Sequence, residues 1–299
     1  MRVVVTGGGG FIGREAVAVL RTRGAEVHLI GRAPASDGVT PHVIDLLVQD
    51  PAPLLRAIAP THLLHLAWYA EPGKFWHAPE NLDWVAASLR LAKAFAAAGG
   101  RRAVFAGSCT EYDWHHETLD EAITPTDAAT LYGTAKAALF RVLVKAAPVL
   151  GVSIGWGRIF FLYGPDENAG RLLPDVVDKV AAGQRVATSD GTQQRDFMHV
   201  EDVAAALVAL LASDVTGAVN IATGILTPVR DLVAQAAAAA GDVGLVDFGA
   251  RPRQAHEPEV MRAAVSRLRD EVGFVPKWTL NDGIVDAVTR RLANRGCER

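Results

Sequence analysis

The sequence has 299 residues, of which 50% are hydrophobic and 21% are charged, and its formal net charge is -3. A chain of this length and composition can bury a sizeable core, in one large domain or two smaller ones, without disulfides. Because the charge is nearly balanced and no block of like charges occurs, we expect no nucleic-acid partner.

The two cysteines, Cys109 and Cys297, stand far apart and outside any CxxC or Cys/His metal-binding spacing. We therefore expect no bound metal and a reducing, cytoplasmic location. The N-terminus begins with a β-branched run and lacks the long apolar segment and cleavage site of a signal peptide. No apolar run reaches the length of a membrane-spanning helix, so we expect no membrane association.

Short β-branched runs alternate with longer Ala/Leu-rich segments through the first 160 residues. The predicted strands are 2–5, 26–30, 42–44, 62–66, 102–106 and 153–161. The predicted helices are 12–23, 53–59, 79–98 and 130–150. This alternation predicts an α/β fold with a doubly wound parallel sheet, covered by helices on both faces.

The pattern changes after Gly164-Pro165, where polar loops surround a helix predicted at 172–182. Further helices are predicted at 201–212 and 228–240, and short strands at 218–222 and 244–248. We expect residues 1–165 to form a Rossmann dinucleotide-binding domain. Residues 166–299 would mainly form a smaller α/β substrate-binding domain, with segments near 197–222 returning to the first.

A glycine-rich turn, TGGGGFIG, follows the first predicted strand, and its glycines at 7, 10 and 13 fit G-x-x-G-x-x-G. Gly7 permits a tight turn, Gly10 lets the backbone approach a pyrophosphate, and Gly13 lets the helix pack on the strand. The N–H groups and dipole at the start of the next helix favour an anion. A flexible surface loop is the alternative, but the position between strand and helix favours a dinucleotide site.

The second predicted strand ends at Gly31-Arg32, where an NAD-specific site usually has an acid for the ribose 2′-OH. Arg32, assisted by Arg14, is suited to the 2′-phosphate of NADP, although both arginines could simply be solvated. We therefore expect NADP as the cofactor, with NAD as the second choice. Asp45-Leu46 could meet the adenine, and Asp45 fits an N-cap equally well.

Tyr132 and Lys136 stand four residues apart in a predicted helix, which places them on one face. The pKa of a free phenol is about 10, and a neighbouring ammonium lowers it. Tyr132 could then exchange a proton with a carbonyl oxygen. Ser108 follows the fifth predicted strand, at the sheet edge where ligands bind. Ser108 could hydrogen-bond the reacting carbonyl, with Thr110 in reach, although a turn or cap role is the alternative for both hydroxyls.

Together these motifs resemble the extended short-chain dehydrogenase/reductase family, which includes nucleotide-sugar epimerases, dehydratases and 4-keto reductases. The resemblance covers nearly the whole chain in order and spacing. Its motifs are T-G-x-x-G-x-x-G, Asp45-Leu46, His65-Leu66-Ala67, Asn81, Ser108, Y-x-x-x-K, Tyr163-Gly164-Pro165 and the segment RDFMHVEDV at 195–203.

The resemblance implies a catalytic triad of Ser108, Tyr132 and Lys136, in which Lys136 also binds the nicotinamide ribose. The cofactor contacts expected from the motifs and the resemblance are Thr6, Gly7, Gly10, Phe11, Ile12, Gly13, Arg32, Asp45, Leu46, Leu66, Ala67, Tyr132 and Lys136. Arg195 and either Arg251 or Arg253 would bind a substrate diphosphate, which suits the guanidinium fork. A solvated loop is the alternative for the last two. The family also implies a homodimer through the helices predicted at 79–98 and 130–150.

Two departures from the family pattern narrow the reaction. The 4,6-dehydratases have an Asp-Glu pair after the catalytic hydroxyl, where this chain has Cys109-Thr110, so we do not expect dehydration. Phe161 stands where the family often has Asn, which removes a polar substrate contact. The sugar pocket could be lined from loops by Trp68, Tyr69, Glu71 and the stretch 112–116, with Trp76 less favoured and local packing as the alternative.

We therefore expect an NADPH-dependent reductase of a nucleotide-activated keto sugar, for example a 4-keto-6-deoxyhexose, with the proton supplied by Tyr132. The enzymatic alternative is a nucleotide-sugar epimerase that keeps a tightly bound NAD. The non-enzymatic alternative is a dinucleotide-sensing Rossmann module.

Overall fold

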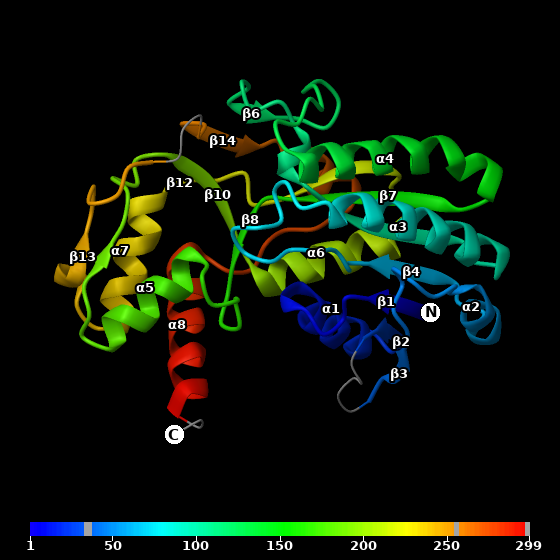
Figure 1. Ribbon diagram of the computed structural model, residues 1–299, viewed down its shortest axis with the longest axis horizontal. Helices are drawn as coiled ribbons and strands as arrows, with labels where there is room; N and C mark the ends of the chain where they lie inside the picture. The colour runs from blue at the N-terminus through cyan, green and yellow to red at the C-terminus, as the bar shows by residue number, and fades with distance from the viewer. Residues whose placement is uncertain (33–37, 254–256, 297–299) are drawn as a thin grey trace.

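The computed structural model describes residues 1–32, 38–253 and 257–296 (Figure 1). A seven-stranded sheet and its covering helices form the larger part, and α5, α7 and α8 gather in a smaller lobe beside it. The strand order of the large sheet is β11-β7-β5-β4-β1-β2-β3, and every neighbouring pair is parallel. The predicted α/β, doubly wound fold is confirmed.

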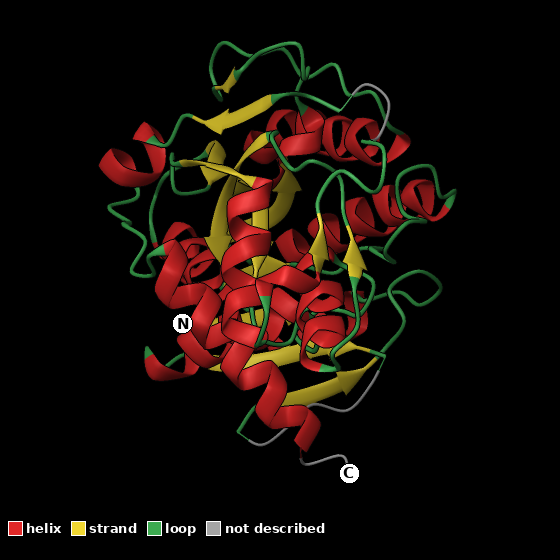
Figure 2. Cartoon of the chain, turned by 90° about the vertical axis from the view of Figure 1, so that its left-hand side faces the viewer, coloured by secondary structure: helices red, strands yellow, loops and turns green. Residues whose placement is uncertain are grey.

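The large sheet contains β1 (Arg2–Thr6), β2 (Glu26–Gly31), β3 (Thr40–Val43), β4 (His62–His65), β5 (Arg102–Ser108), β7 (Ser153–Ile159) and β11 (Gly217–Ile221). The surrounding helices are α1 (Phe11–Thr22), α2 (Ala52–Ile58), α3 (Glu80–Ala97), α4 (Leu131–Leu150) and α6 (Val200–Ala212). Figure 2 shows helices on both sides of the strands.

Both faces of the sheet are buried, which explains why its strands are almost continuously apolar. Val3 and Val5 point to one side and join a core with α1 and α6, whereas Val4 points to the other and joins a core with α3 and α4. This alternation is the two-residue period of a strand. It fixes the register, so the strand ends, and whatever follows them, meet at one edge.

The smaller lobe contains short strands and three helices. A five-stranded sheet is formed by β6 (Thr118–Leu119), β8 (Phe161–Tyr163), β10 (Gln194–His199), β12 (Leu226–Pro228) and β14 (Val260–Ala263), and β9 (Val186–Ala187) pairs with β13 (Val246–Asp247). The helices are α5 (Leu172–Ala181), α7 (Val229–Ala240) and α8 (Leu280–Gly296), with short turns η1 (Cys109–Glu111), η2 (Val243–Leu245) and η3 (Arg267–Glu271). The three helices share a separate apolar core.

Several elements differ from the sequence prediction. The strand predicted at 153–161 is broken at Phe160, whose N–H donates to the carbonyl of Ile221 at 3.2 Å, and β8 then leaves the large sheet to pair with β10. The segment 244–248 is mostly a turn, with a strand of only two residues. The sequence patterns do not predict α8 or the strands β6, β10, β12 and β14. The strands are short, and α8 lacks a clear hydrophobic period.

None of the helices in the described ranges is long and apolar enough to cross a membrane. Within the same ranges, no group of three or more His, Cys, Asp or Glu side chains is arranged to hold a metal ion.

Candidate active site

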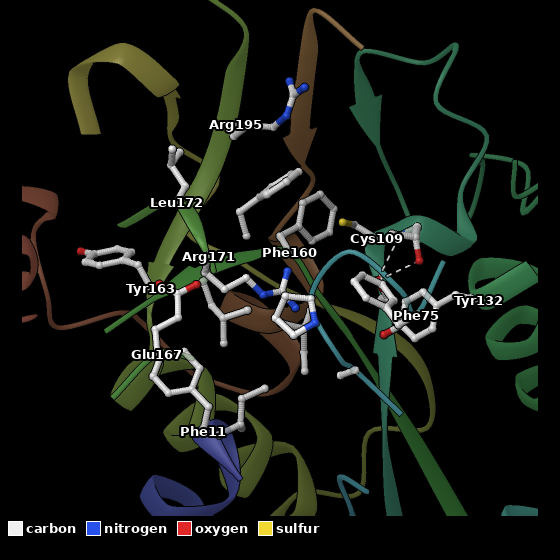
Figure 3. Close-up of a pocket in the computed structure, with 18 of the residues that line it drawn as sticks. Phe11, Phe75, Cys109, Tyr132, Phe160, Tyr163, Glu167, Arg171, Leu172 and Arg195 are labelled. Atoms are coloured by element: carbon white, nitrogen blue, oxygen red, sulfur yellow. Dashed lines mark hydrogen bonds between the residues drawn. The ribbon is translucent and has the colours of Figure 1, made fainter. Parts of the chain in front are cut away.

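A cavity of about 960 Å³ opens at the carboxyl edge of the large sheet, and Figure 3 shows many of the side chains around it. Its lining comes from the glycine turn, the end of β5, the first turns of α4, the start of α5 and part of β10. Ligands of open parallel sheets bind at this edge. The cavity therefore contains both the glycine turn and the predicted catalytic residues Ser108, Tyr132 and Lys136.

The turn between β1 and α1 has no room for side chains at two of its glycines. Gly7 has a φ of +72°, and a Cβ atom there would lie 2.7 Å from the backbone nitrogen of Ala67. A Cβ atom on Gly13 would collide with the carbonyl oxygen of Gly7. Gly10 is the N-cap of α1, whose first turn contains no acidic residue. The free N–H groups of this turn therefore form a cradle that fits a dinucleotide pyrophosphate.

The residues predicted to contact the adenosine follow neighbouring strands, because β4, β1, β2 and β3 are adjacent in the sheet. Arg32 follows β2 and is exposed. Asp45 follows β3, and its carboxylate accepts the N–H of Leu47 at 3.0 Å, so it caps the local turn. Ala67 follows β4 and contacts the glycine turn. The strand order thus brings these positions to one edge, while Asp45 has a structural role of its own.

Three of the predicted cofactor contacts turn their side chains into the fold instead. Thr6 is fully buried, and its hydroxyl is hydrogen-bonded to His65 Nδ1 at 2.7 Å. Leu46 belongs to the core on the α3 and α4 side of the sheet, and Leu66 packs against the core on the opposite side. The side chains of Thr6 and Leu46 are therefore buried in the fold, whereas that of Leu66 is half-buried.

Ser108 and Tyr132 are brought together by the packing of α4 against η1. This packing requires Gly133, because a Cβ atom there would collide with the carbonyl oxygen of Thr110. Ser108 Oγ accepts the Thr110 hydroxyl at 2.9 Å, and both Ser108 and Tyr132 line the cavity. Burial raises the pKa of Tyr132 above its ordinary value, and the neighbouring Ser108 side chain opposes that rise. The Thr110 hydroxyl therefore donates its proton to a hydrogen bond with Ser108 and is not free to donate to a substrate.

Lys136 lies one turn beyond Tyr132 on α4 and is buried. Its Nζ donates to the carbonyl oxygen of Ala106 at 2.7 Å. The same atom lies 3.7 Å from the centre of a Trp68 ring and 5.9 Å from the centre of the Tyr132 ring. Burial lowers the pKa of Lys136 to about 7, so its charge is sensitive to its surroundings at neutral pH.

The positions after Ser108 offer no acid–base pair to a substrate. Burial raises the pKa of the Cys109 thiol to about 12, so the thiol stays protonated. Glu111 is fully buried, accepts the N–H of Ser108 at 2.8 Å and pairs with Arg158 at 2.9 Å. Its carboxylate therefore stabilises the end of β5 and is not free to act as an acid or base in an elimination.

Of the three arginines predicted to bind a diphosphate, Arg195 alone lines the cavity. It is 2% exposed, and its guanidinium pairs with Glu257 at 2.8 Å. Arg253 lies outside the cavity lining and pairs with Asp190 at 2.6 Å. Arg251 is exposed and also lies outside the lining. The charge of Arg195 is thus already balanced within the protein.

Arg171 is a cavity residue that the sequence analysis missed. It is the N-cap of α5, and Figure 3 shows its guanidinium directed into the cavity. It lies 5.5 Å from the centre of the Phe75 ring and makes no side-chain hydrogen bond or salt bridge to the described residues. A cation at a helix N-terminus is unfavourable unless an anion accompanies it. That mismatch is the sequence signal that could have identified Arg171 as a binding residue.

Glu167 was also missed, because nothing in the sequence distinguishes it from a solvated loop carboxylate. One of its carboxyl oxygens is buried without a hydrogen-bond partner in the described structure. Burial raises the pKa of Glu167 to about 8, although Arg171 and Arg291 oppose that rise. Its carboxyl group is therefore largely protonated at neutral pH and can donate a hydrogen bond into the cavity.

Aromatic rings surround Tyr132. The ring centres of Phe75 and Trp76 lie 4.9 Å and 6.3 Å from that of Tyr132, and Trp114 lies 6.5 Å from Trp76. Trp76, Trp114 and Glu71, expected in loops beside the sugar, all line the cavity. A sugar ring presents an apolar face of C–H groups, which packs well against such rings.

The parallel fold, the glycine cradle and the Ser108–Tyr132–Lys136 cluster define a nicotinamide-dinucleotide enzyme of the extended short-chain dehydrogenase/reductase type. A model of the NAD dependent epimerase/dehydratase family matches residues 3–222. The chain therefore belongs to this family.

Several proteins that are similar to this chain are UDP-glucose 4-epimerases. The chain is 26% identical to the UDP-glucose 4-epimerase of Corynebacterium glutamicum, over 99% of this chain and 98% of the relative. The Thermus thermophilus UDP-glucose 4-epimerase, solved in complex with NAD, superposes with a TM-score of 0.85 at 27% identity, covering 98% of this chain and 99% of that one. MoeE5, solved with UDP-glucuronic acid and NAD, superposes with a TM-score of 0.84 at 27% identity, covering 98% and 100%.

These similarities change two of the sequence-based preferences. They do not support a reductase as the first choice, and the epimerase alternative fits them better. They also do not support NADP before NAD, since the two solved structures contain NAD. The preference for NADP depended on Arg32, which is exposed and is not among the residues that line the cavity.

Proposed function

We propose that the protein is an NAD-dependent epimerase of a nucleotide-activated sugar. The observation that carries this proposal is that Ser108, Tyr132 and Lys136 line the same cavity as the glycine cradle. The epimerase reaction is favoured over net reduction by the similarity to UDP-glucose 4-epimerases along almost the whole chain. Dehydration is disfavoured because Glu111 is committed to Arg158 and the two positions before it are uncharged.

Different residues of the chain would bind the cofactor and transfer the proton. The glycine cradle would hold the pyrophosphate of NAD, and Lys136 would lie at its nicotinamide ribose. Bound NAD supplies a hydride acceptor that can return the hydride to the opposite face of the sugar carbon. Tyr132 takes the hydroxyl proton as the carbonyl forms and gives it back on reduction, while Ser108 hydrogen-bonds the same oxygen. The Lys136 ammonium stabilises the Tyr132 phenolate.

The nucleotide diphosphate needs a positive charge that the protein has not already balanced. Arg195 is paired with Glu257, whereas the guanidinium of Arg171 faces the cavity and has no carboxylate partner at salt-bridge distance among the described residues. We therefore assign Arg171 as the main diphosphate contact, with Arg195 beside it.

Replacing Arg171 with Gln should raise KM for the nucleotide sugar about tenfold or more, with a much smaller change in kcat. The reason is the loss of charge-assisted hydrogen bonds, which contribute about 1.5–3 kcal/mol. Initial rates over a range of nucleotide-sugar concentrations measure both constants. Arg253→Gln is the matched control, because Arg253 lies outside the cavity lining. Equal KM values for the two variants would remove Arg171 from the substrate site.

The cofactor retained by the purified protein tests the epimerase against the reductase. An epimerase restores its cofactor in every cycle and has no need to release it, so we expect denaturation to liberate about one equivalent of NAD per chain. Chromatography of the liberated nucleotides identifies the cofactor. The reductase is favoured by Arg32, which suits NADPH. Protein that is free of nucleotide and consumes added NADPH with a keto sugar would establish the reductase instead.

We further propose a homodimer formed through α3 and α4, which pack against each other. Leu82, Val142 and Val149 are exposed on these helices at 60%, 50% and 88%. Light scattering at micromolar concentration should give the mass of two chains. Val142→Glu should shift the mass towards one chain, whereas Val275→Glu, at another exposed valine, should not. A monomeric mass for the unmodified protein would refute the dimer.

A further inference from the structure

The proposed mechanism uses the positive charge of Lys136, but the buried surroundings of this side chain disfavour that charge. Its side chain is 3% exposed, and burial is the main cause of its low pKa. Among the described residues, no carboxylate lies within salt-bridge distance of it. Glu111, the carboxylate with the largest influence on it, is paired with Arg158. The groups that directly compensate the ammonium are the carbonyl of Ala106 and the indole of Trp68.

The Trp68 indole is held firmly beneath the ammonium. Its Nε1 donates to Asn81 Oδ1 at 2.8 Å, and Asn81 Nδ2 donates to the carbonyls of Phe75 and Ala78, both at 2.8 Å. The ring of Trp84 stacks on Trp68 with centres 6.2 Å apart. The ring can leave Lys136 only by breaking these contacts. An ammonium 3.7 Å from an indole centre is a favourable cation–π contact, and such contacts are strongest away from water.

We propose that Trp68 is a positioning residue for Lys136, whose indole face keeps the ammonium charged and directed towards Tyr132. The effect on the charge of Lys136 does not depend on the reaction. The consequence for turnover rests on the proposed function, because there the ammonium stabilises the Tyr132 phenolate.

The other titratable groups around Lys136 cannot replace this contribution. His65, on β4, is hydrogen-bonded on both ring nitrogens, and its pKa is lowered to about 3 by burial and by the charge of Lys136, so it stays neutral. Tyr132, on the same helix, has a raised pKa and is neutral in the resting protein. Glu111, on η1, is neutralised by Arg158 on β7. Removing the π face therefore leaves burial to lower the pKa of Lys136 further.

The direct test is the titration of Lys136 by ¹³C NMR, in protein labelled at the lysine side chains and without added substrate. Lys136→Met assigns the resonance. We expect Trp68→Met to lower the Lys136 midpoint by about one unit, since a desolvated cation–π contact corresponds to roughly that much. Trp68→Phe, which keeps a weaker π face, should titrate between Trp68→Met and the unmodified protein. Trp278→Met is the matched control, because Trp278 packs on His199 with ring centres 4.6 Å apart, and it should leave the midpoint nearly unchanged.

A second measurement avoids any change of fold. Fluorinated tryptophan has nearly the size of tryptophan but a weaker π face, so its incorporation should lower the Lys136 midpoint stepwise with the number of fluorine atoms. A midpoint unaffected by fluorination, or equal shifts in Trp68→Met and Trp278→Met, would overturn the proposal. In the enzyme assay, the alkaline limb of kcat should move to lower pH in Trp68→Met by the shift that NMR measures. A shifted titration in a protein without activity would refute the proposed function and leave the role of Trp68 standing.

Discussion

Tyr132→Phe should lose about 10³-fold in kcat, because general acid–base catalysis by a positioned side chain contributes on the order of 10²–10⁴-fold. The ring, its contacts with Phe75 and Trp76, and the glycine cradle all remain. Affinity for NAD should therefore stay close to that of the unmodified protein. Steady-state rates and a binding titration with NAD measure the two effects separately.

Tyr112→Phe is the matched control for this variant. Tyr112 is fully buried, and its hydroxyl donates to Asn220 Oδ1 at 2.7 Å, so its hydroxyl has a structural partner. Its removal should cost about 1 kcal/mol of unfolding free energy and leave kcat nearly intact. If Tyr132→Phe kept the turnover of Tyr112→Phe, the proton would have to come from another group.

Glu111→Gln should lower the unfolding free energy by about 3–5 kcal/mol, because it leaves the guanidinium of Arg158 buried without its counter-charge. Both side chains are almost completely buried, at 0% and 2% exposed. Because Glu111 also accepts the N–H of Ser108, the catalytic end of β5 should loosen as well. Denaturant unfolding measures the first effect, and kcat measures the second.

The exposed pair Arg2–Glu26 provides the comparison for this buried pair. It has a similar distance of 2.9 Å but lies in solvent, so Glu26→Gln should change stability very little. The double variant Glu111→Gln/Arg158→Met should be more stable than Glu111→Gln alone, because no unpaired charge is left. A loss for Glu111→Gln no larger than for Glu26→Gln would contradict the supporting role of this carboxylate.

The parts of the site that the sequence predicted are those governed by local geometry and by sheet topology. The glycine turn was recognisable because Gly7 and Gly13 are required by the backbone itself. Ser108 was placed correctly in the cavity because it ends a central parallel strand. Helical spacing places Tyr132 and Lys136 on one face, and the neighbouring Ser108 and the other motifs of the resemblance give that pair its functional weight.

The substrate side was less predictable because it depends on partners that are distant in sequence. Nothing near Arg253 in the sequence indicates that Asp190 binds its guanidinium, and nothing near Arg195 indicates a balancing Glu257 brought in by the chain before β14. The sequence pattern places Arg171 in a loop, although its position at a helix N-terminus distinguishes it. The short strands of the smaller lobe were missed for a related reason, since their pairing partners lie far along the chain.

The most direct test of the proposed function is incubation of the purified protein with individual nucleotide sugars, followed by separation of the sugar products and by the absorbance of reduced nicotinamide. We predict that one of these sugars is converted to a mixture with its epimer, without net formation of NADH and without added cofactor. The same experiment with Tyr132→Phe should give no conversion. If a panel of UDP- and dTDP-sugars gave only products with matching gain or loss of reduced nicotinamide, the protein would be a dehydrogenase or reductase. Binding of NAD without any conversion would indicate the dinucleotide-sensing module.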